Sequence, residues 1–146
     1  MKVVIQRVNY ASVSVENKLI SKINKGLLIF VGIGKNDNQK DIEYIIRKIL
    51  NLRIFDTTEK FMDKNVKDLD LEILSVSQFT LCVNFRKGNR PSFDMSMPSK
   101  EAAKFYRKFF LKLKEKYPKA KDGIFGAYMD IKLSNDGPVT IILDSK

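Results

Sequence analysis

The hydrophobic pattern at the start of this chain has a period of two, and this constrains the fold more than any other feature. Apolar and polar residues alternate over residues 2–8 and again, more cleanly, over 11–15. Residues 19–25 and 27–33 give two further strands, which are divided at Gly26. The first part of the chain is therefore predicted to form β-strands joined by short turns.

Helical spacing occurs in only two stretches. The first follows the cap candidates at 36–38 and continues to about residue 50, and the second spans about 98–117. Strand patterns return at 71–83, 125–133 and 138–143. About eight strands and two main helices, with no linker between them, predict one sheet-rich α/β or α+β domain over the whole chain.

The composition excludes several catalytic classes. The chain has no histidine, which excludes Ser-His-Asp and Cys-His catalysis and an HExxH zinc site. Its single cysteine, Cys82, makes neither an internal disulfide nor a CxxC metal site, as is typical of a reducing, cytoplasmic setting. Gln6 and Arg7 interrupt the segment where a signal peptide needs an apolar core, and no run approaches the roughly 18 apolar residues of a membrane span.

The formal net charge of +10 favours a polyanionic partner, because each phosphate contact releases counterions. Residues 100–121 hold nine basic and two acidic residues, so this window alone carries +7 of the excess. Two interpretations stay open here. The helix faces RNA, or it presents an ordinary solvated face in a chain where 21 of the 27 basic residues are Lys.

Three segments carry polar residues in unusual places. Residues 75–81 put hydroxyls and an amide at the end of a buried strand, although β-propensity and local backbone bonding also explain them. Residues 87–93 form a cationic loop that fits either a phosphate or an exposed turn. Residues 135–140 contain Gly137-Pro138, and X-Pro bonds have ready access to the cis isomer, although Pro is also tolerated at the start of a strand.

Taken together, five segments resemble the D-aminoacyl-tRNA deacylase (D-tyrosyl-tRNA deacylase) family in order and spacing. They are Gln6-Arg7-Val8 with Ala11-Ser12-Val13, Ser77-Gln78-Phe79-Thr80-Leu81, Gly88-Asn89-Arg90-Pro91-Ser92-Phe93, Phe125-Gly126-Ala127-Tyr128-Met129, and Asn135-Asp136-Gly137-Pro138-Val139-Thr140. The resemblance implies a cytoplasmic homodimer with a compact, barrel-like fold. It implies hydrolysis of the ester that joins a D-amino acid to tRNA, as proofreading in translation. It implies tRNA as partner, and no metal, cofactor, membrane or DNA.

The resemblance also assigns a chirality filter. In this family the Gly-Pro pair is cis and enters the partner subunit's pocket, which here implies Gly137 and Pro138, with Arg7 holding the segment. A rigid backbone wall excludes an L side chain and leaves room on the D side. Because glycine has no side chain to exclude, glycyl-tRNA mischarged on alanine tRNA is an expected second substrate.

The resemblance places Ser77, Gln78, Phe79 and Thr80 at the catalytic pocket. Two mechanisms compete for these residues. Thr80 is a nucleophile, or backbone N–H groups near Phe79 and Thr80 form an oxyanion hole while water attacks with help from the substrate's ribose hydroxyl. We favour the second mechanism, because the chain has no histidine to activate a hydroxyl.

Further substrate contacts are expected at Phe125, Met129 and Ala102, and phosphate contacts at Lys87 and Arg90. The sequence departs from the family pattern at residues 121–124 and at Cys82-Val83, which affects the expected contacts at the rim. Two other classes remain as alternatives, a non-catalytic RNA-binding module and a hydrolase of small esters.

Overall fold

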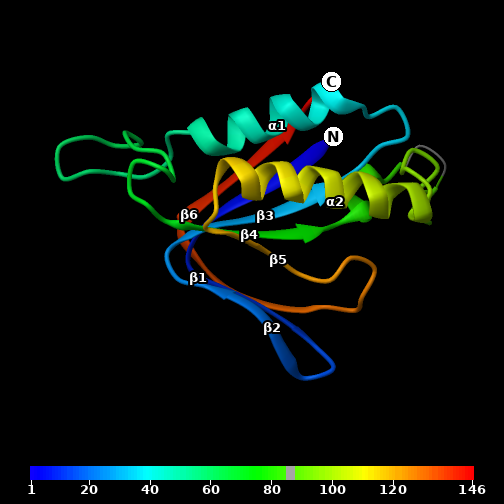
Figure 1. Ribbon diagram of the computed structural model, residues 1–146, viewed down its shortest axis with the longest axis horizontal. Coiled ribbons are helices and arrows are strands. Elements are labelled where there is room, and N and C mark those ends of the chain that lie inside the picture. The colour runs from blue at the N-terminus through cyan, green and yellow to red at the C-terminus, as the bar shows by residue number, and fades with distance from the viewer. Residues whose placement is uncertain (85–87) are drawn as a thin grey trace.

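The computed structural model describes residues 1–84 and 88–146. Its strands and helices, in chain order, are β1 (Lys2–Val15), β2 (Lys18–Ile23), β3 (Gly26–Gly32), α1 (Gln39–Asn51), β4 (Glu72–Ser77), the 3-10 turn η1 (Phe79–Cys82), α2 (Ser99–Lys116), β5 (Ala120–Asp122) and β6 (Asp130–Asp144). The described residues thus form a mixed sheet and two α-helices, which confirms the predicted fold class (Figure 1).

The sheet bends around β1, which is long enough to pair with three other strands. Its first half pairs with β3 and its second half with β2, while β6 runs along its other side, all antiparallel. The order continues from β3 to β4 and β5 through parallel pairs. The result is a sheet nearly closed into a barrel, with α1 and α2 over its upper face in Figure 1.

The apolar run in β3 reflects burial of both faces of that strand. Leu27, Ile29 and Val31 join the core beneath the two helices. Leu28 points to the opposite side and joins a second core inside the curved sheet, where Phe30 also packs. Since successive strand side chains face opposite ways, a strand covered on both sides is apolar throughout.

The sequence located α1 well, because its start is fixed locally. The Asn38 side chain accepts a hydrogen bond from the Lys40 N–H, and the Asp41 carboxylate accepts one from the Asn38 N–H, at 2.9 and 2.7 Å. Burial raises the pKa of Asp41, but this hydrogen bond and those from Lys146 and Ser145 outweigh it and bring the pKa to about 2. The carboxylate thus stays charged where it stabilises the first turn.

Several predicted strand boundaries were wrong. Residues 2–8 and 11–15 belong to one strand, whose register against β6 shifts around Val8, and 130–144 is likewise continuous. The strand predicted at 71–83 ends at Ser77 and gives way to η1, and residues 125–129 precede β6. The three-residue β5 was missed because so short a segment has no readable period. None of the described helices is long and apolar enough to span a membrane.

Candidate active site

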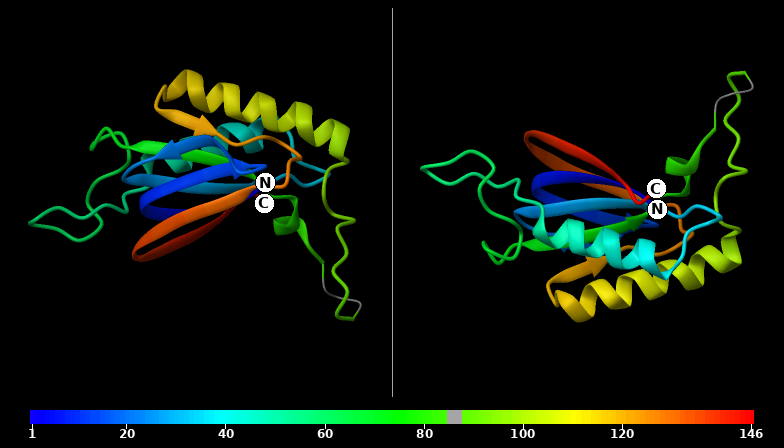
Figure 2. Two further views of the ribbon diagram at one scale, coloured as in Figure 1. Left: turned by 90° about the horizontal axis from the view of Figure 1, so that it is seen from below. Right: turned by 90° about the horizontal axis from the view of Figure 1, so that it is seen from above.

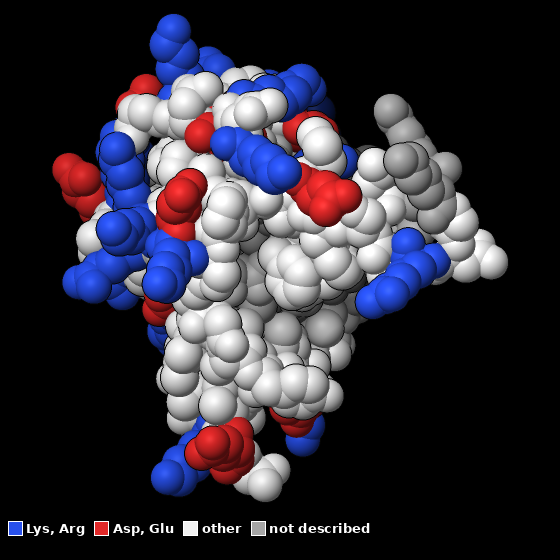
Figure 3. Space-filling view, turned by 90° about the vertical axis from the view of Figure 1, so that its right-hand side faces the viewer, with Lys and Arg blue, Asp and Glu red and all other residues white. Residues whose placement is uncertain are grey.

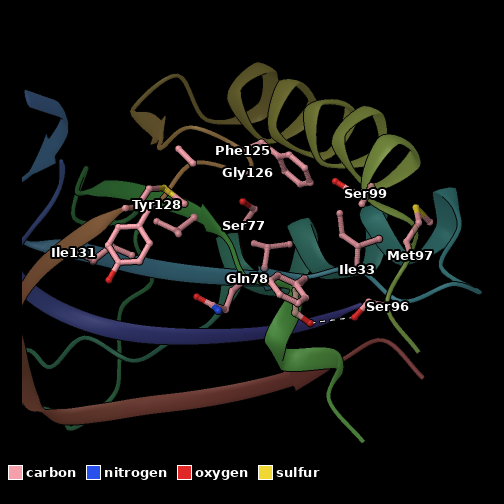
Figure 4. Close-up of a pocket in the computed structure, with 16 residues that line it drawn as sticks. Ile33, Ser77, Gln78, Ser96, Met97, Ser99, Phe125, Gly126, Tyr128 and Ile131 are labelled. Carbon is pink, nitrogen blue, oxygen red and sulfur yellow. Dashed lines mark hydrogen bonds between the residues drawn. The ribbon is translucent and has the colours of Figure 1, made fainter. Parts of the chain in front are cut away.

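A cavity of about 530 Å³ lies where β3 and β4 end. Its walls come from four parts of the chain, the ends of these strands, η1, the start of α2 and the segment before and into β6 (Figure 4). The lining residues are Val31, Ile33, Val76, Ser77, Gln78, Phe79, Ser96, Met97, Ser99, Ala102, Phe125, Gly126, Ala127, Tyr128, Met129 and Ile131. The cavity is therefore mostly apolar, with a few hydroxyl and amide groups among its lining.

One buried hydroxyl of the 75–81 segment is structural. Ser75 is fully buried in β4, and its Oγ lies 2.9 Å from the hydroxyl of Tyr106 on α2. Burial is the main cause that raises the pKa of Tyr106 far above its usual value, so the phenol stays neutral. This bond satisfies two buried polar groups and ties β4 to α2 behind the cavity.

The turn η1 exposes backbone donors beside the cavity. Because η1 begins at Phe79, its first N–H groups have no preceding turn to bond. Within the described chain, the N–H groups of Phe79 and Thr80 have no hydrogen-bond acceptor. These two groups are available to a ligand.

The side chains of η1 are held in place by polar and aromatic contacts. The Gln78 Nε2 donates to the Thr80 Oγ1. The Ser96 hydroxyl donates to the Phe79 carbonyl at 3.2 Å, and the Phe79 ring packs edge-to-face on Phe93 at 4.9 Å between centroids. The Phe79 side chain remains 58% exposed at the cavity wall.

A second feature lies in β6, where Gly137 and Pro138 leave the strand as a bulge. Gln6 pairs with Thr140 and Val8 with Asn135, so Arg7 alone faces the four residues between them. The Gly137–Pro138 peptide bond is cis, and both residues are exposed.

Arg7 supports this bulge from below. Its side chain is buried, and its guanidinium donates to the carbonyls of Ile54 at 2.6 Å and of Asp136 at 3.1 Å. It also pairs with the carboxylates of Asp56 and Asp136 at 3.1 and 3.3 Å. A hydrogen bond from the Met62 N–H, followed by the nearby Arg7 charge, lowers the pKa of Asp56. The buried charge is thus fully partnered.

Asn135 closes the bulge from the other side. The Asn135 Oδ1 accepts a hydrogen bond from the Val139 N–H at 2.9 Å, and its Nδ2 donates to the Thr140 hydroxyl at 3.2 Å. The exposed Gly137-Pro138 step is therefore held at both ends by side chains.

The match of a family model to nearly the whole chain decides its affiliation. The model described as D-Tyr-tRNA(Tyr) deacylase matches residues 4–144. The chain belongs to this family. Its membership confirms the resemblance that five short segments indicated.

A curated relative carries the name of this family, and two solved structures share the fold. A curated protein of Thermosipho melanesiensis (strain DSM 12029 / CIP 104789 / BI429), named D-aminoacyl-tRNA deacylase, is 50% identical over 147 residues, covering 100% of this chain and 98% of the relative. A solved structure titled "c-Myc DNA Unwinding Element Binding Protein" is 48% identical and has a TM-score of 0.95. The match covers 100% of this chain and 99% of that chain. A structure titled as a probable eukaryotic D-amino acid tRNA deacylase is 15% identical with a TM-score of 0.85, covers 97% of both chains, and shows the fold alone.

The structure brings together part of the predicted family site. Ser77, Gln78 and Phe79 line the cavity with Ala102, and Phe125 and Met129 complete the opposite wall. Thr80 is adjacent on η1 but is not part of the lining.

The remaining predicted residues lie elsewhere. Arg7, Gly137 and Pro138 do not line the cavity, and the turn of β6 that joins its orange and red parts lies at the opposite end of the sheet from η1 (Figures 1 and 2). Arg90 is exposed in the loop before α2 and does not line the cavity. Lys87 lies outside the described residues.

Sequence reasoning missed several lining residues. Tyr128, Ser96 and Ser99 face the cavity, and the Tyr128 side chain is 95% exposed at its edge. Tyr128 stands inside the quoted Phe125–Met129 motif, so that motif was the available signal. Ser96 and Ser99 belong to no such motif. No group of His, Cys, Asp or Glu suited to a metal occurs among the residues that the structure describes.

Proposed function

We propose that this chain hydrolyses the ester bond of D-aminoacyl-tRNA, releasing the D-amino acid and tRNA. The observation that carries the proposal is the cavity, because two of the family's motif segments, residues 77–79 and 125–129, form its facing walls. Its volume of about 530 Å³ falls within the range of small-molecule sites. A mostly apolar cavity of this size suits the terminal adenosine with its attached amino acid.

The reaction proceeds through backbone groups in this proposal. The free N–H groups of Phe79 and Thr80 bind the carbonyl oxygen of the ester as negative charge develops on it. Water adds to the carbonyl carbon, the bond to the ribose oxygen breaks, and that oxygen takes up a proton with help from the neighbouring ribose hydroxyl. Each such donor contributes about 3–4 kcal/mol to the transition state.

Thr80 itself is a poor candidate for the nucleophile. Its hydroxyl accepts a hydrogen bond from the Gln78 amide, which is not a base. No histidine exists in the chain to take the proton of the hydroxyl. These two facts support the oxyanion-hole mechanism over the covalent one.

Chirality is selected by the Gly137-Pro138 step of a second copy of the chain. Within one chain this step lies far from η1, and it is exposed, yet Arg7 and Asn135 fix its position. A homodimer that inserts the step into the partner's cavity places a stiff backbone wall beside the Cα of the substrate. An L side chain collides with the wall, whereas a D side chain or glycine does not.

The direct test compares D-tyrosyl-, L-tyrosyl- and glycyl-tRNA in single-turnover assays. We expect cleavage of the D-form and of glycine on alanine tRNA, and no cleavage of the L-form above the buffer rate. An RNA-binding module leaves all three intact, and a hydrolase of small esters cleaves both tyrosyl forms together with simple ester substrates. Comparable rates on D- and L-tyrosyl-tRNA contradict the exclusion of L side chains by the Gly137-Pro138 backbone.

Mixed dimers test the second copy. Gly137→Ala displaces the Gly137-Pro138 step and leaves the chain's own cavity intact. Ala102→Phe fills the cavity and leaves the step in place. When the two inactive variants exchange subunits, each mixed dimer contains one site with an intact cavity and an intact step. Activity should then return. If mixing restores nothing while both variants still dimerise, the step does not act across subunits.

A further inference from the structure

We propose that the outer face of the first half of α2 binds the phosphate backbone of the tRNA acceptor end. The binding surface consists of Lys100, Lys104, Arg107 and Lys108, called here the α2 cation stripe. The inference rests on the proposed function, and it separates the two interpretations of the basic window that the sequence left open.

The structure divides the basic residues of this window into two groups. Most of those toward its C-terminal end are engaged within the protein, and Lys116 is the exception among the described residues. Lys112 pairs with Glu43 at 3.2 Å and Lys121 with Glu72 at 2.6 Å, while Lys119 pairs with Asp70 and Lys114 donates to a backbone carbonyl. Their positive charges are therefore largely satisfied by the fold.

The α2 cation stripe differs in this respect. All four side chains are exposed, and within the described chain none of them forms an ion pair. Glu101 is the only acidic residue in the first three turns of α2. The positive end of the helix dipole and the i, i+4 spacing of like charges both disfavour this arrangement in the free protein. Binding of an external polyanion relieves both of these unfavourable interactions.

The length of the stripe suits the phosphates of a stacked, helical nucleic-acid strand. The buried residues Ala102, Tyr106, Phe109 and Leu113 turn the opposite face of α2 to the core. The stripe therefore projects to solvent over about 12 Å of helix, which corresponds to three or four phosphates at about 3.4 Å per nucleotide along one strand.

The stripe also begins at the mouth of the cavity. Ser99 and Ala102, in the first turn of α2, line the cavity, and Lys100 and Lys104 follow on the outer side of the same helix. Figure 3 views the molecule from the right-hand side of Figure 1 and shows a hollowed, mostly uncharged surface with Lys and Arg residues beside it. A tRNA whose terminal adenosine fills the cavity must leave it over one of its walls, and among the described residues α2 is a wall that carries a row of cations without ion pairs.

The test uses Lys104→Gln/Arg107→Gln and a control, Lys18→Gln/Lys116→Gln, that removes the same charge elsewhere. Lys18 and Lys116 are exposed and form no ion pair among the described residues, and Lys116 lies at the far end of α2, about 24 Å from Lys100. Each protein is assayed on D-tyrosyl-tRNA and on D-tyrosyl-adenosine, which occupies the cavity but carries no phosphates.

For Lys104→Gln/Arg107→Gln we expect kcat/KM on D-tyrosyl-tRNA to fall about 5- to 30-fold. The slope of log kcat/KM against log salt should become shallower by about 1.5, the value for two lost phosphate contacts. The rate on D-tyrosyl-adenosine should stay within about twofold of wild type, and the control should lose less than about threefold on either substrate.

Three outcomes of the kinetic assays overturn the proposal. They are an equal loss on D-tyrosyl-adenosine, an equal loss in the control, or an unchanged salt slope on tRNA. Affinity for uncharged tRNA and for duplex DNA of matched length is measured by fluorescence anisotropy in parallel. An equal loss for DNA reduces the stripe to a general polyanion surface and also overturns the proposal. If the wild-type protein binds tRNA through the stripe but cleaves neither substrate, only the proposed function is refuted.

Discussion

Gly137→Ala is the substitution for which the structure gives the clearest expectation. Gly137 has φ of +125°, a region that L side chains rarely adopt. A Cβ there lies 2.9 Å from the Val139 Cγ2 and 3.1 Å from the Arg7 Nη2. Both neighbours are buried, so neither side chain has free room to withdraw. The Gly137-Pro138 step itself must therefore move.

The cost follows from these contacts. Backbone strain of this kind costs about 1–3 kcal/mol. For a chain of this size each kcal/mol lowers Tm by about 2–4 °C, so we expect a loss of about 2–12 °C with the fold retained. A displacement near 1 Å at the substrate costs about 100-fold in rate, and this is the drop expected on D-tyrosyl-tRNA.

The assay combines thermal unfolding with single-turnover deacylation at a temperature where the variant is fully folded. Gly88→Ala provides the stability control, since Gly88 has φ of +75° but a Cβ there meets nothing within 4 Å. Its Tm should fall by less than that of Gly137→Ala, because the substitution strains the backbone at a positive φ but makes no short Cβ contact. A folded Gly137→Ala variant that cleaves D-tyrosyl-tRNA within about threefold of wild type would refute the role of the step.

Two further predictions concern Thr80 and the first turn of α1. Thr80→Ala should keep most of its single-turnover activity, because the N–H donors of η1 remain; a loss of about 1,000-fold with intact binding would make the hydroxyl the nucleophile. The pKa of Asp41 is lowered to about 2, so its carboxylate stabilises the fold above about pH 4, and this contribution disappears as the pH falls through 2. Asp41→Asn should therefore lose about 1–2 kcal/mol of unfolding free energy at pH 7, measured in urea, and the difference from wild type should shrink toward pH 2.

The sequence was most informative where local physics decides the outcome. The Asn38 cap and the three-four spacing of isoleucines defined α1, and alternating patterns found most strands. The extent of the strands was less predictable. The register shifts in β1 and the bulge of β6 read as strand ends in the sequence, although pairing between the two continues on both sides of them.

The candidate site likewise contains residues that the local sequence reveals and others that only the packing reveals. The motif segments carried the residue identities, including Phe79, Phe125 and Met129, because backbone turns and cavity walls restrict which residues fit. Ser96 and Ser99 were missed because their place in the cavity depends on where the loop before α2 packs, which no local pattern records.

The sequence by itself determined the class of fold, the absence of histidine chemistry and the family's motifs. Only the tertiary structure decided which groups can act together. It bonded Ser75 to Tyr106 behind the cavity, and it supplied the carbonyls of Ile54 and Asp136 as partners of Arg7. The physical reason is that hydrogen bonds and ion pairs between distant residues depend on how the sheet curves, and a linear pattern of hydrophobicity carries no information about that curvature.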